Sequence, residues 1–253
     1  MKKILLLGST GVLGETFSKN LIKNNQLFIA DNNIKMLKTL SERYNLFYSY
    51  CDVKKKSSIK NTVKLAIKKL GQIDIVIHNI AQTSEGLLKN NNKFPDFKSI
   101  SLETWDNDFK INLTSAFQLS QEMDKVWNKS KKLKSFITVA SIYGLKIPNP
   151  KLYINEDFYT LPSYVASKAA LIAFTKWLSV FWVKKNIAVN SISPGGIKNN
   201  QSKNFIIKYQ SLVPSSSMIN REEVLKILEF LINNESVNFT GQNLTIDGGY
   251  TVW

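Results

Sequence analysis

Thiol and imidazole side chains are almost absent from this sequence, which contains one cysteine and one histidine. Cys51 and His78 alone cannot build a disulfide framework within one chain, nor a metal site of clustered cysteine and histidine ligands. We therefore expect no metal, and any chemistry must come from other groups.

Long apolar runs are also missing. No apolar stretch approaches the roughly 20 residues that cross a bilayer. The start, Met1-Lys2-Lys3 followed by four apolar residues and Gly8, lacks the apolar region and cleavage site of a signal peptide. We expect a cytoplasmic, reduced setting and no membrane partner.

Arginine is scarce in a chain that is otherwise strongly basic, with a formal net charge of +15. Only Arg43 and Arg221 are arginine among the 34 basic residues, which leaves 32 lysines. Nucleic-acid sites favour arginine because its guanidinium binds phosphates and bases through two parallel hydrogen bonds. The lysines are dispersed, with short clusters only at Lys54–Lys56 and Lys131-Lys132. We interpret the charge as a solvated basic surface and expect no nucleic-acid partner.

Short apolar runs alternate with longer helical patterns along the 253 residues, which is typical of repeated βα units and a parallel sheet. The expected strands are Lys3–Leu7, Leu27–Ala30, Leu46–Tyr50, Ile73–Ile77, Lys134–Ala140, Ile187–Ile192 and Asn243–Asp247. The expected helices are Gly14–Asn24, Asn33–Arg43, Ser57–Leu70, Glu103–Lys129, Ser163–Lys185 and Arg221–Asn233. No linker or repeat divides the chain, so we predict one α/β domain over residues 1–253. Its doubly wound sheet has about seven parallel strands, with helices on both faces.

The first predicted strand runs into Gly8-Ser9-Thr10-Gly11-Val12-Leu13-Gly14 and then a helix. Glycines let the backbone turn tightly and approach phosphates, and a helix N-terminus supplies N–H donors, so this position suits a dinucleotide pyrophosphate. The second predicted strand ends at Ala30-Asp31, where a carboxylate accepts hydrogen bonds from the adenosine ribose and repels a 2′-phosphate. We therefore favour NAD over NADP. The alternative for Asp31 is a helix cap or a turn residue.

Tyr164 and Lys168 are four positions apart in a predicted helix, so their side chains share one face. A lysine ammonium beside a phenol favours the phenolate, which a general acid/base requires. Tyr50 and Lys54 have the same spacing, but Tyr50 ends a predicted strand. Tyr164 instead follows a strand that ends near Ser141, at the sheet edge where ligands bind.

These residues occur in an order that resembles the short-chain dehydrogenase/reductase family, and the resemblance spans the whole chain. Its motifs are Gly8/Gly11/Gly14, Asp31, Cys51-Asp52-Val53, His78-Asn79-Ile80-Ala81, Asn112, Ser141, Tyr164-Val165-Ala166-Ser167-Lys168 and Pro194-Gly195-Gly196-Ile197. Three stretches also resemble a bacterial subgroup found in flagellin-modification and nonulosonate pathways: Ser141–Gly144, Ser193–Ile197 and Gly241–Gly249.

The resemblance implies a Rossmann-like fold and four catalytic residues. Tyr164 would exchange a proton with the substrate oxygen, and Ser141 would hydrogen-bond the same oxygen. Lys168 would hold the nicotinamide ribose and lower the pKa of Tyr164, and Asn112 would anchor a water that relays the proton outward. Without this ordered context, Asn112 is equally a helix polar residue satisfied by backbone, and Ser141 a strand-end cap.

The resemblance also implies a set of cofactor contacts. Asp52 and Val53 would frame the adenine, Asn79 would lie on the adenosine side, and the Ile197 backbone would bind the carboxamide. The full set is Gly8, Thr10, Gly11, Val12, Leu13, Gly14, Asp31, Asp52, Val53, Asn79, Ile80, Ala81, Tyr164, Lys168, Pro194, Gly195 and Ile197.

The sequence departs from the family pattern in three places. The GxxGxxG spacing is that of the longer, epimerase-like branch, and His78-Asn79-Ile80-Ala81 replaces Asn-Asn-Ala-Gly, so we interpret His78 as a structural strand-end residue. Ser141 and Tyr164 are 23 positions apart, which is longer than usual. We expect the extra loop, Leu145–Pro162, to lie beside the substrate. Its polar groups favour a hydroxylated, sugar-like substrate over an acyl chain, and the alternative is a surface loop without substrate contact.

The sequence therefore predicts an NAD-dependent oxidoreductase that interconverts a secondary alcohol and a ketone on a polar substrate. The alternatives are an NADP-linked reductase, a sugar epimerase, or a dinucleotide-binding regulator without catalysis. We also expect a homo-oligomer, dimer or tetramer, because the helix after Tyr164 is apolar nearly all round, as Phe174, Trp177, Val180 and Phe181 illustrate. The alternative is burial of these residues under the chain's own loops.

Overall fold

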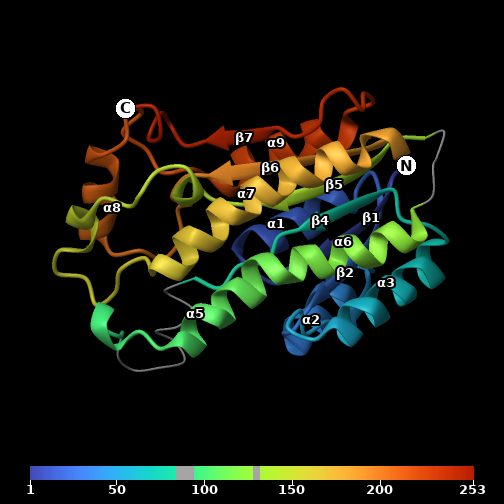
Figure 1. Cartoon of the computed structure of the whole chain (residues 1–253), viewed down its shortest axis with the longest axis horizontal. Helices are drawn as coiled ribbons and strands as arrows, with labels where there is room; N and C mark the ends of the chain where they lie inside the picture. The colour runs from blue at the N-terminus through green and yellow to red at the C-terminus, as the bar shows by residue number, and fades with distance from the viewer. Residues whose placement is uncertain (84–93, 128–131) are drawn as a thin grey trace.

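The computed structural model describes residues 1–83, 94–127 and 132–253. Within them, seven parallel strands form one sheet in the order β3-β2-β1-β4-β5-β6-β7 (Figure 1). The strands are Lys3–Leu7 (β1), Gln26–Asp31 (β2), Phe47–Tyr50 (β3), Ile75–His78 (β4), Lys134–Val139 (β5), Ile187–Pro194 (β6) and Asn243–Ile246 (β7). The strand order reverses between β1 and β4, which is where ligands bind in doubly wound sheets. The predicted fold class is confirmed.

Helices cover both faces of the sheet. They are Val12–Leu21 (α1), Ile34–Tyr44 (α2), Lys56–Leu70 (α3), Leu102–Phe109 (α5), Ser115–Val126 (α6), Pro162–Trp182 (α7), Lys203–Ser211 (α8) and Arg221–Asn233 (α9). Apolar side chains of α1, α2 and α9 bury one face, with Phe17, Leu37 and Leu228 among them. Those of α3, α6 and α7 bury the other, with Val63, Leu119 and Trp182 among them. The two-sided core explains why the central strands are mainly apolar and lack the alternation of a half-exposed strand.

Three strands extend beyond their predicted ends, β2 to Asp31, β4 to His78 and β6 to Pro194, because polar residues there find hydrogen-bond partners. β4 includes His78, whose Nε2 lies 2.7 Å from Ser115 Oγ. β6 continues to Pro194, and the hydroxyls of Ser191 and Ser193 donate to Asn243 Oδ1 on β7. A prediction based on apolar runs stops at such residues.

The predicted helix Glu103–Lys129 is not one regular α-helix. A π-helical turn at Lys110–Thr114 separates α5 from α6 and contains Asn112. Its predicted last residues, 128 and 129, lie outside the described part of the chain. Inserted π turns are frequent at functional sites.

One predicted helix begins at a different residue, and one helix was not predicted. α1 begins at Val12 rather than Gly14, because Gly11 is its N-cap. The sequence did not predict α8, which is short and begins after Ser202, whose hydroxyl accepts the Phe205 N–H.

No helix in the described ranges has the length and apolar character needed to cross a membrane. Among the same residues, no group of three or more His, Cys, Asp or Glu is placed to hold a metal ion.

Candidate active site

A cleft of about 470 Å³ opens at the carboxyl edge of the sheet, where the loops after β1, β4, β5 and β6 meet. Twelve of the predicted site residues line it: Gly11, Val12, Leu13, Asn79, Ile80, Ala81, Ser141, Tyr164, Lys168, Pro194, Gly195 and Ile197. Seven others do not: Gly8, Thr10, Gly14, Asp31, Asp52, Val53 and Asn112. The parallel strands thus bring residues together that lie almost 190 positions apart in the chain.

The glycine turn after β1 has two tight positions and one open one. A Cβ on Gly8, whose φ is +79°, would lie 2.1 Å from the Asn79 carbonyl oxygen, and one on Gly14 would lie 2.1 Å from that of Gly8. A Cβ on Gly11 would meet nothing within 4 Å. Gly11 is also the N-cap of α1 and supplies no side-chain cap. The first N–H groups of α1 therefore face open space in the cleft, which is a fit for a pyrophosphate.

Asp31 lies at the end of β2 against the same turn. Its Oδ2 accepts the Thr10 N–H at 3.0 Å, and its Oδ1 accepts the Asn33 N–H at 3.2 Å. The helix cap of α2 is Asn33 rather than Asp31. The carboxylate is therefore tied to the glycine turn, beside the cleft.

Asp52 and Val53 follow β3 and lie outside the cleft lining. Asp52 Oδ1 accepts the Lys54 N–H at 3.1 Å, and Oδ2 lies 3.7 Å from Lys55 Nζ. The aspartate thus stabilises its own turn.

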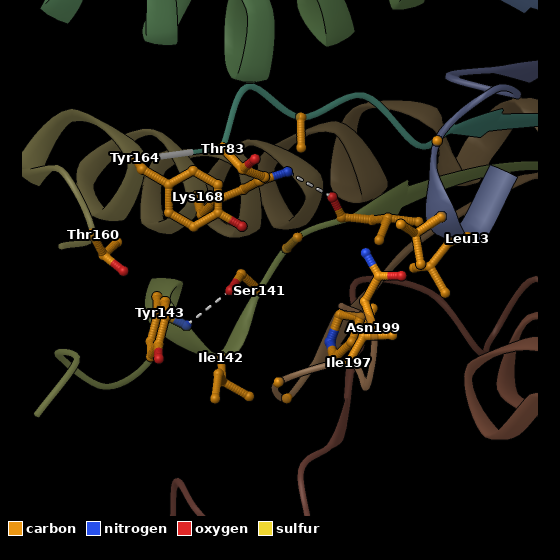
Figure 2. Close-up of a pocket in the computed structure, with 18 of the residues that line it drawn as sticks. Leu13, Thr83, Ser141, Ile142, Tyr143, Thr160, Tyr164, Lys168, Ile197 and Asn199 are labelled. Carbon is orange, nitrogen blue, oxygen red and sulfur yellow. Dashed lines mark hydrogen bonds between the residues drawn. The ribbon is translucent and has the colours of Figure 1, made fainter. Parts of the chain in front are cut away.

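Tyr164 and Lys168 project from the first turns of α7 into the cleft, opposite Ser141 (Figure 2). Lys168 is 1% exposed, and its Nζ donates to the carbonyl oxygens of Val139 at 2.9 Å and Ile80 at 3.2 Å. Burial lowers the pKa of Lys168 to about 7. The ammonium lies 5.9 Å from the centre of the Tyr164 ring. The lysine therefore titrates near neutral pH, with its ammonium close to the Tyr164 ring.

Ser141 both lines the cleft and caps a turn. Its Oγ accepts the Tyr143 N–H at 3.1 Å, at the start of a 3-10 turn over Ile142–Gly144 (Figure 2). This bond uses the oxygen as an acceptor, so the hydroxyl hydrogen remains able to donate. Capping and substrate contact are thus compatible.

Asn112 lies in the π turn, beneath the cleft rather than in its lining. Its Oδ1 accepts the Gln82 N–H at 2.8 Å, and its Nδ2 donates to Ser167 Oγ at 2.9 Å. The amide therefore connects the loop after β4 to α7, one residue before Lys168.

His78 is completely buried, and its Nδ1 has no hydrogen-bond partner among the described residues. Burial, and secondarily the charge of Lys168, lower the pKa of His78 to about 3. The imidazole is therefore neutral at physiological pH and lies outside the cleft lining, as a structural strand-end residue would.

The competing pair, Tyr50 and Lys54, does not form a comparable site. Tyr50 ends β3 with half of its surface exposed, and Lys54 follows in a loop. Neither residue lines the cleft.

The extra loop, Leu145–Pro162, contributes rings rather than charges to the cleft. The loop residues Tyr153, Phe158 and Thr160 line it, as does Tyr143 of the Ser141–Gly144 motif. Other lining residues lie in no sequence motif: Thr83, Asn199, Gln201, Phe205, Tyr209 and Met218. Two charged side chains of the loop bond elsewhere. Lys146 donates to the Tyr250 carbonyl, and Glu156 lies 3.6 Å from Lys208 Nζ. The loop therefore reaches the cleft, but these two charged groups do not line it.

The family was tested by comparison with known proteins. The family model described as "Enoyl-(Acyl carrier protein) reductase" matches residues 23–251, including Ser141 and the Tyr164–Lys168 segment. The chain belongs to the short-chain dehydrogenase/reductase family. As a member of this family it is an oxidoreductase, which confirms the predicted enzyme class.

Individual relatives match this short-chain dehydrogenase/reductase over nearly its full length. The 3-oxoacyl-(acyl-carrier-protein) reductase FabG of Buchnera aphidicola subsp. Schizaphis graminum is 30% identical, over 98% of this chain and 96% of its own. The post-translational flagellin modification protein A of Campylobacter coli is 27% identical, over 98% of both chains. A crystal structure of a short-chain dehydrogenase from Leptospira borgpetersenii with bound NAD+ is similar with a TM-score of 0.84 and 27% identity. That match covers 99% of this chain and 93% of the other.

Proposed function

We propose that this protein is an NAD-dependent dehydrogenase or reductase that interconverts a secondary alcohol and a ketone on a polar, sugar-like substrate. The observation that carries the proposal is the convergence of Tyr164, Lys168 and Ser141 on one cleft (Figure 2), beside the open Gly11 turn.

The proposed chemistry is a proton transfer at Tyr164. A bound nicotinamide dinucleotide would supply the hydride acceptor or donor. In the oxidative direction the Tyr164 phenolate takes the proton of the substrate hydroxyl, and in the reductive direction the phenol returns it. Lys168 favours the phenolate by its charge, and the Ser141 hydroxyl donates to the substrate oxygen. Asn112 bonds Ser167 and so fixes the π turn to α7, at the place where it would anchor the water that relays the proton.

The cofactor assigned here is NAD rather than NADP. Gly8, Gly11 and Gly14 shape the phosphate turn, and Thr10, Val12, Leu13, Ile80, Ala81, Pro194, Gly195 and Ile197 complete the proposed binding surface. The Asp31 carboxylate, bonded to Thr10, would lie near the adenosine ribose and repel a 2′-phosphate. The NAD+ in the Leptospira relative supports this assignment.

The substrate assigned here is a hydroxylated ring. The cleft wall combines aromatic rings with uncharged hydroxyl and amide groups, including Tyr153, Thr160, Asn199 and Gln201. These polar groups also bond one another or neighbouring protein groups, which fixes their positions in the wall. Rings pack against the apolar faces of a sugar, while hydroxyl and amide groups bond its hydroxyls. The Campylobacter coli post-translational flagellin modification protein A supports the resemblance to the flagellin-modification subgroup.

An acyl substrate is the second candidate. Phe158, Phe205 and Met218 give one part of the wall an apolar surface, and the Buchnera relative is a 3-oxoacyl reductase. A keto group on an acyl chain would use the same Tyr164 and Ser141.

The whole chain, residues 1–253, is assigned here to a single dehydrogenase domain that works in the cytoplasm as a homo-oligomer, most simply a homotetramer. The unpaired, buried Cys51 is compatible with a reducing compartment. The exposed apolar face of α7 supports the oligomer.

The test is a turnover screen with the full chain. Amino sugars, sugar phosphates and nucleotide sugars would be offered with NAD+ and NADP+, and 3-oxoacyl thioesters with NADH and NADPH. The proposal expects NADH to accumulate with a sugar and NAD+. Turnover only with the thioesters would favour the acyl alternative, and turnover only with NADP would overturn the cofactor assignment. Epimerisation without net NADH would indicate an epimerase. Tight NAD binding without any turnover would indicate a regulator.

A further inference from the structure

A buried carboxyl group that the proposed chemistry does not use lies one helix away from Tyr164. Asp108, on α5, is 1% exposed, and its Oδ2 accepts the hydroxyl of Ser163 at 2.5 Å. Its Oδ1 has no hydrogen-bond partner among the described residues. Burial raises the pKa of Asp108, and the Ser163 hydrogen bond lowers it only in part. Burying a carboxyl group with one oxygen unbonded lowers the stability of the fold, so packing alone does not explain an aspartate at this position.

The Asp108–Ser163 bond is one of two similar bonds to α7, the first from α5 and the second from the π turn that follows it. Asn112, four residues after Asp108, donates to Ser167, four residues after Ser163. The two serines immediately precede Tyr164 and Lys168 in the chain. α5 and α7 pack against each other (Figure 1). Each side chain of the acid/base pair therefore follows a residue that is fixed to the neighbouring helix.

The first turn of α7 needs such an attachment. A helix N-terminus is held by side-chain caps, and its first turn frays when these are missing. Leu161 is the N-cap, and its side chain cannot accept a hydrogen bond from the first turn. Ser163, in that turn, is completely buried and bonds Asp108 on α5. The Asp108 carboxyl thus restrains a first turn that has no side-chain cap of its own.

We propose that Asp108 and Ser163 form a positioning pair that fixes the first turn of α7, so that the Tyr164 phenol stays beside the Lys168 ammonium. This inference rests on the proposed role of Tyr164 as acid/base. Asp108 touches neither substrate nor cofactor and acts through Ser163.

The test uses variants of the full chain that break or preserve the bond. Ser163→Ala and Asp108→Ala remove it, while Asp108→Asn keeps a side-chain oxygen that accepts from Ser163 and removes the charge. Thr175→Val is the matched control, because it breaks a buried hydroxyl pair with Thr138 at 2.9 Å farther along α7. The NAD+ complex would be labelled with ¹³Cζ-tyrosine, and the Tyr164 signal identified by its loss in Tyr164→Phe.

The readout is the pKa of Tyr164. The other charged or titratable groups of the site are the same in every variant: Lys168 on α7, His78 on β4, and Tyr143, Tyr153 and Tyr209 in the cleft wall. Both alanine variants are expected to raise the pKa of Tyr164 by roughly half a pH unit or more, because the phenol moves away from the ammonium. Asp108→Asn and Thr175→Val should keep the wild-type value. Where turnover is established, kcat of the alanine variants should fall about tenfold with the NAD dissociation constant within about twofold.

Two outcomes would contradict the proposal that Asp108 and Ser163 position Tyr164. One is a Tyr164 pKa that does not move in the alanine variants, and the other is an equal shift in Asp108→Asn or Thr175→Val. The proposed function fails separately, by absence of wild-type turnover in the substrate screen, because the tyrosine titration does not require turnover.

Discussion

Buried ionisable side chains at the ends of β4 and β5 determine how the candidate site responds to pH. Lys168 is held by two backbone carbonyls, and burial brings its pKa to about 7. His78 ends β4, and burial, with a smaller effect of the Lys168 charge, lowers the pKa of its imidazole to about 3. The lysine therefore titrates in the working range, whereas the histidine stays neutral throughout it.

His78 should make the fold sensitive to acid. Its pKa is about 3 in the folded chain, against 6.5 for a histidine exposed to water, so the unfolded chain binds a proton that the folded chain does not. The stability contribution is present above pH 6.5 and is lost as the pH falls toward 3. Between about pH 7.5 and about pH 5, the unfolding free energy of the wild type should fall by about 2 kcal/mol more than that of His78→Gln. Urea unfolding at both pH values measures this, and equal losses would contradict the assignment.

Asp31 should control the choice of cofactor. Asp31→Asn keeps an oxygen for the Thr10 N–H and removes the charge that repels a 2′-phosphate. The ratio of NADP to NAD dissociation constants should fall about tenfold or more, which corresponds to about 1.4 kcal/mol. Calorimetric titration with both cofactors checks it. Glu42→Gln, which removes an exposed carboxylate on α2, is the control and should leave the ratio unchanged.

At the scale of elements, two glycines in the turn between β1 and α1 have different roles. We expect Gly14 to be needed for stability, and Gly11 to be needed for cofactor binding. Gly14→Ala places a Cβ against backbone and should lower the unfolding free energy by about 1–3 kcal/mol. Gly11→Ala meets no protein atom within 4 Å, so stability should be nearly unchanged while the NAD dissociation constant rises about tenfold or more. Denaturant unfolding and cofactor titration of both variants test the difference. Unaltered NAD binding by Gly11→Ala would contradict a phosphate at this turn.

The alternating strands and helices could be predicted from the sequence, and the residues that form the cleft wall could not. Strands such as β1 and β4 are buried and consist mainly of apolar residues, and Tyr164 and Lys168 share a helix face by spacing alone. Phe158, Phe205 and Tyr209 come from the extra loop and from α8, and their packing depends on contacts between distant segments. Glu156 and Lys146 looked available for substrate, but long-range bonds to Lys208 and Tyr250 use them. No local pattern contains such partners.

At the scale of the whole molecule, one surface differs from the rest. An apolar groove between α6 and α7 is lined by Phe117, Phe174, Trp177 and Phe181 among others. Trp177 is 59% exposed and Phe181 is 56% exposed, so no loop within the described ranges covers them. The alternative of burial under the loops is therefore wrong for these residues. Such a patch is typical of a subunit interface.

The chain should therefore sediment as a multiple of 28.8 kDa at micromolar concentration. Replacing Trp177 and Phe181 together with glutamate should yield the 28.8 kDa monomer, because the charges would be buried in the interface. Ile207→Glu, at a 66% exposed apolar position on α8, is the control and should leave the assembly intact. A wild-type monomer with full activity would contradict the interface.

The central claim is that Tyr164 exchanges the proton in an NAD-dependent reaction. Its most direct measurement is the turnover of Tyr164→Phe, with the best substrate from the screen, beside wild type and Tyr50→Phe. The phenylalanine keeps the ring and removes the proton donor, so turnover should fall roughly 100-fold or more while NAD binding is retained. Tyr50→Phe, at the exposed end of β3, should keep wild-type turnover. Full activity of Tyr164→Phe, or an equal loss in both variants, would contradict the account.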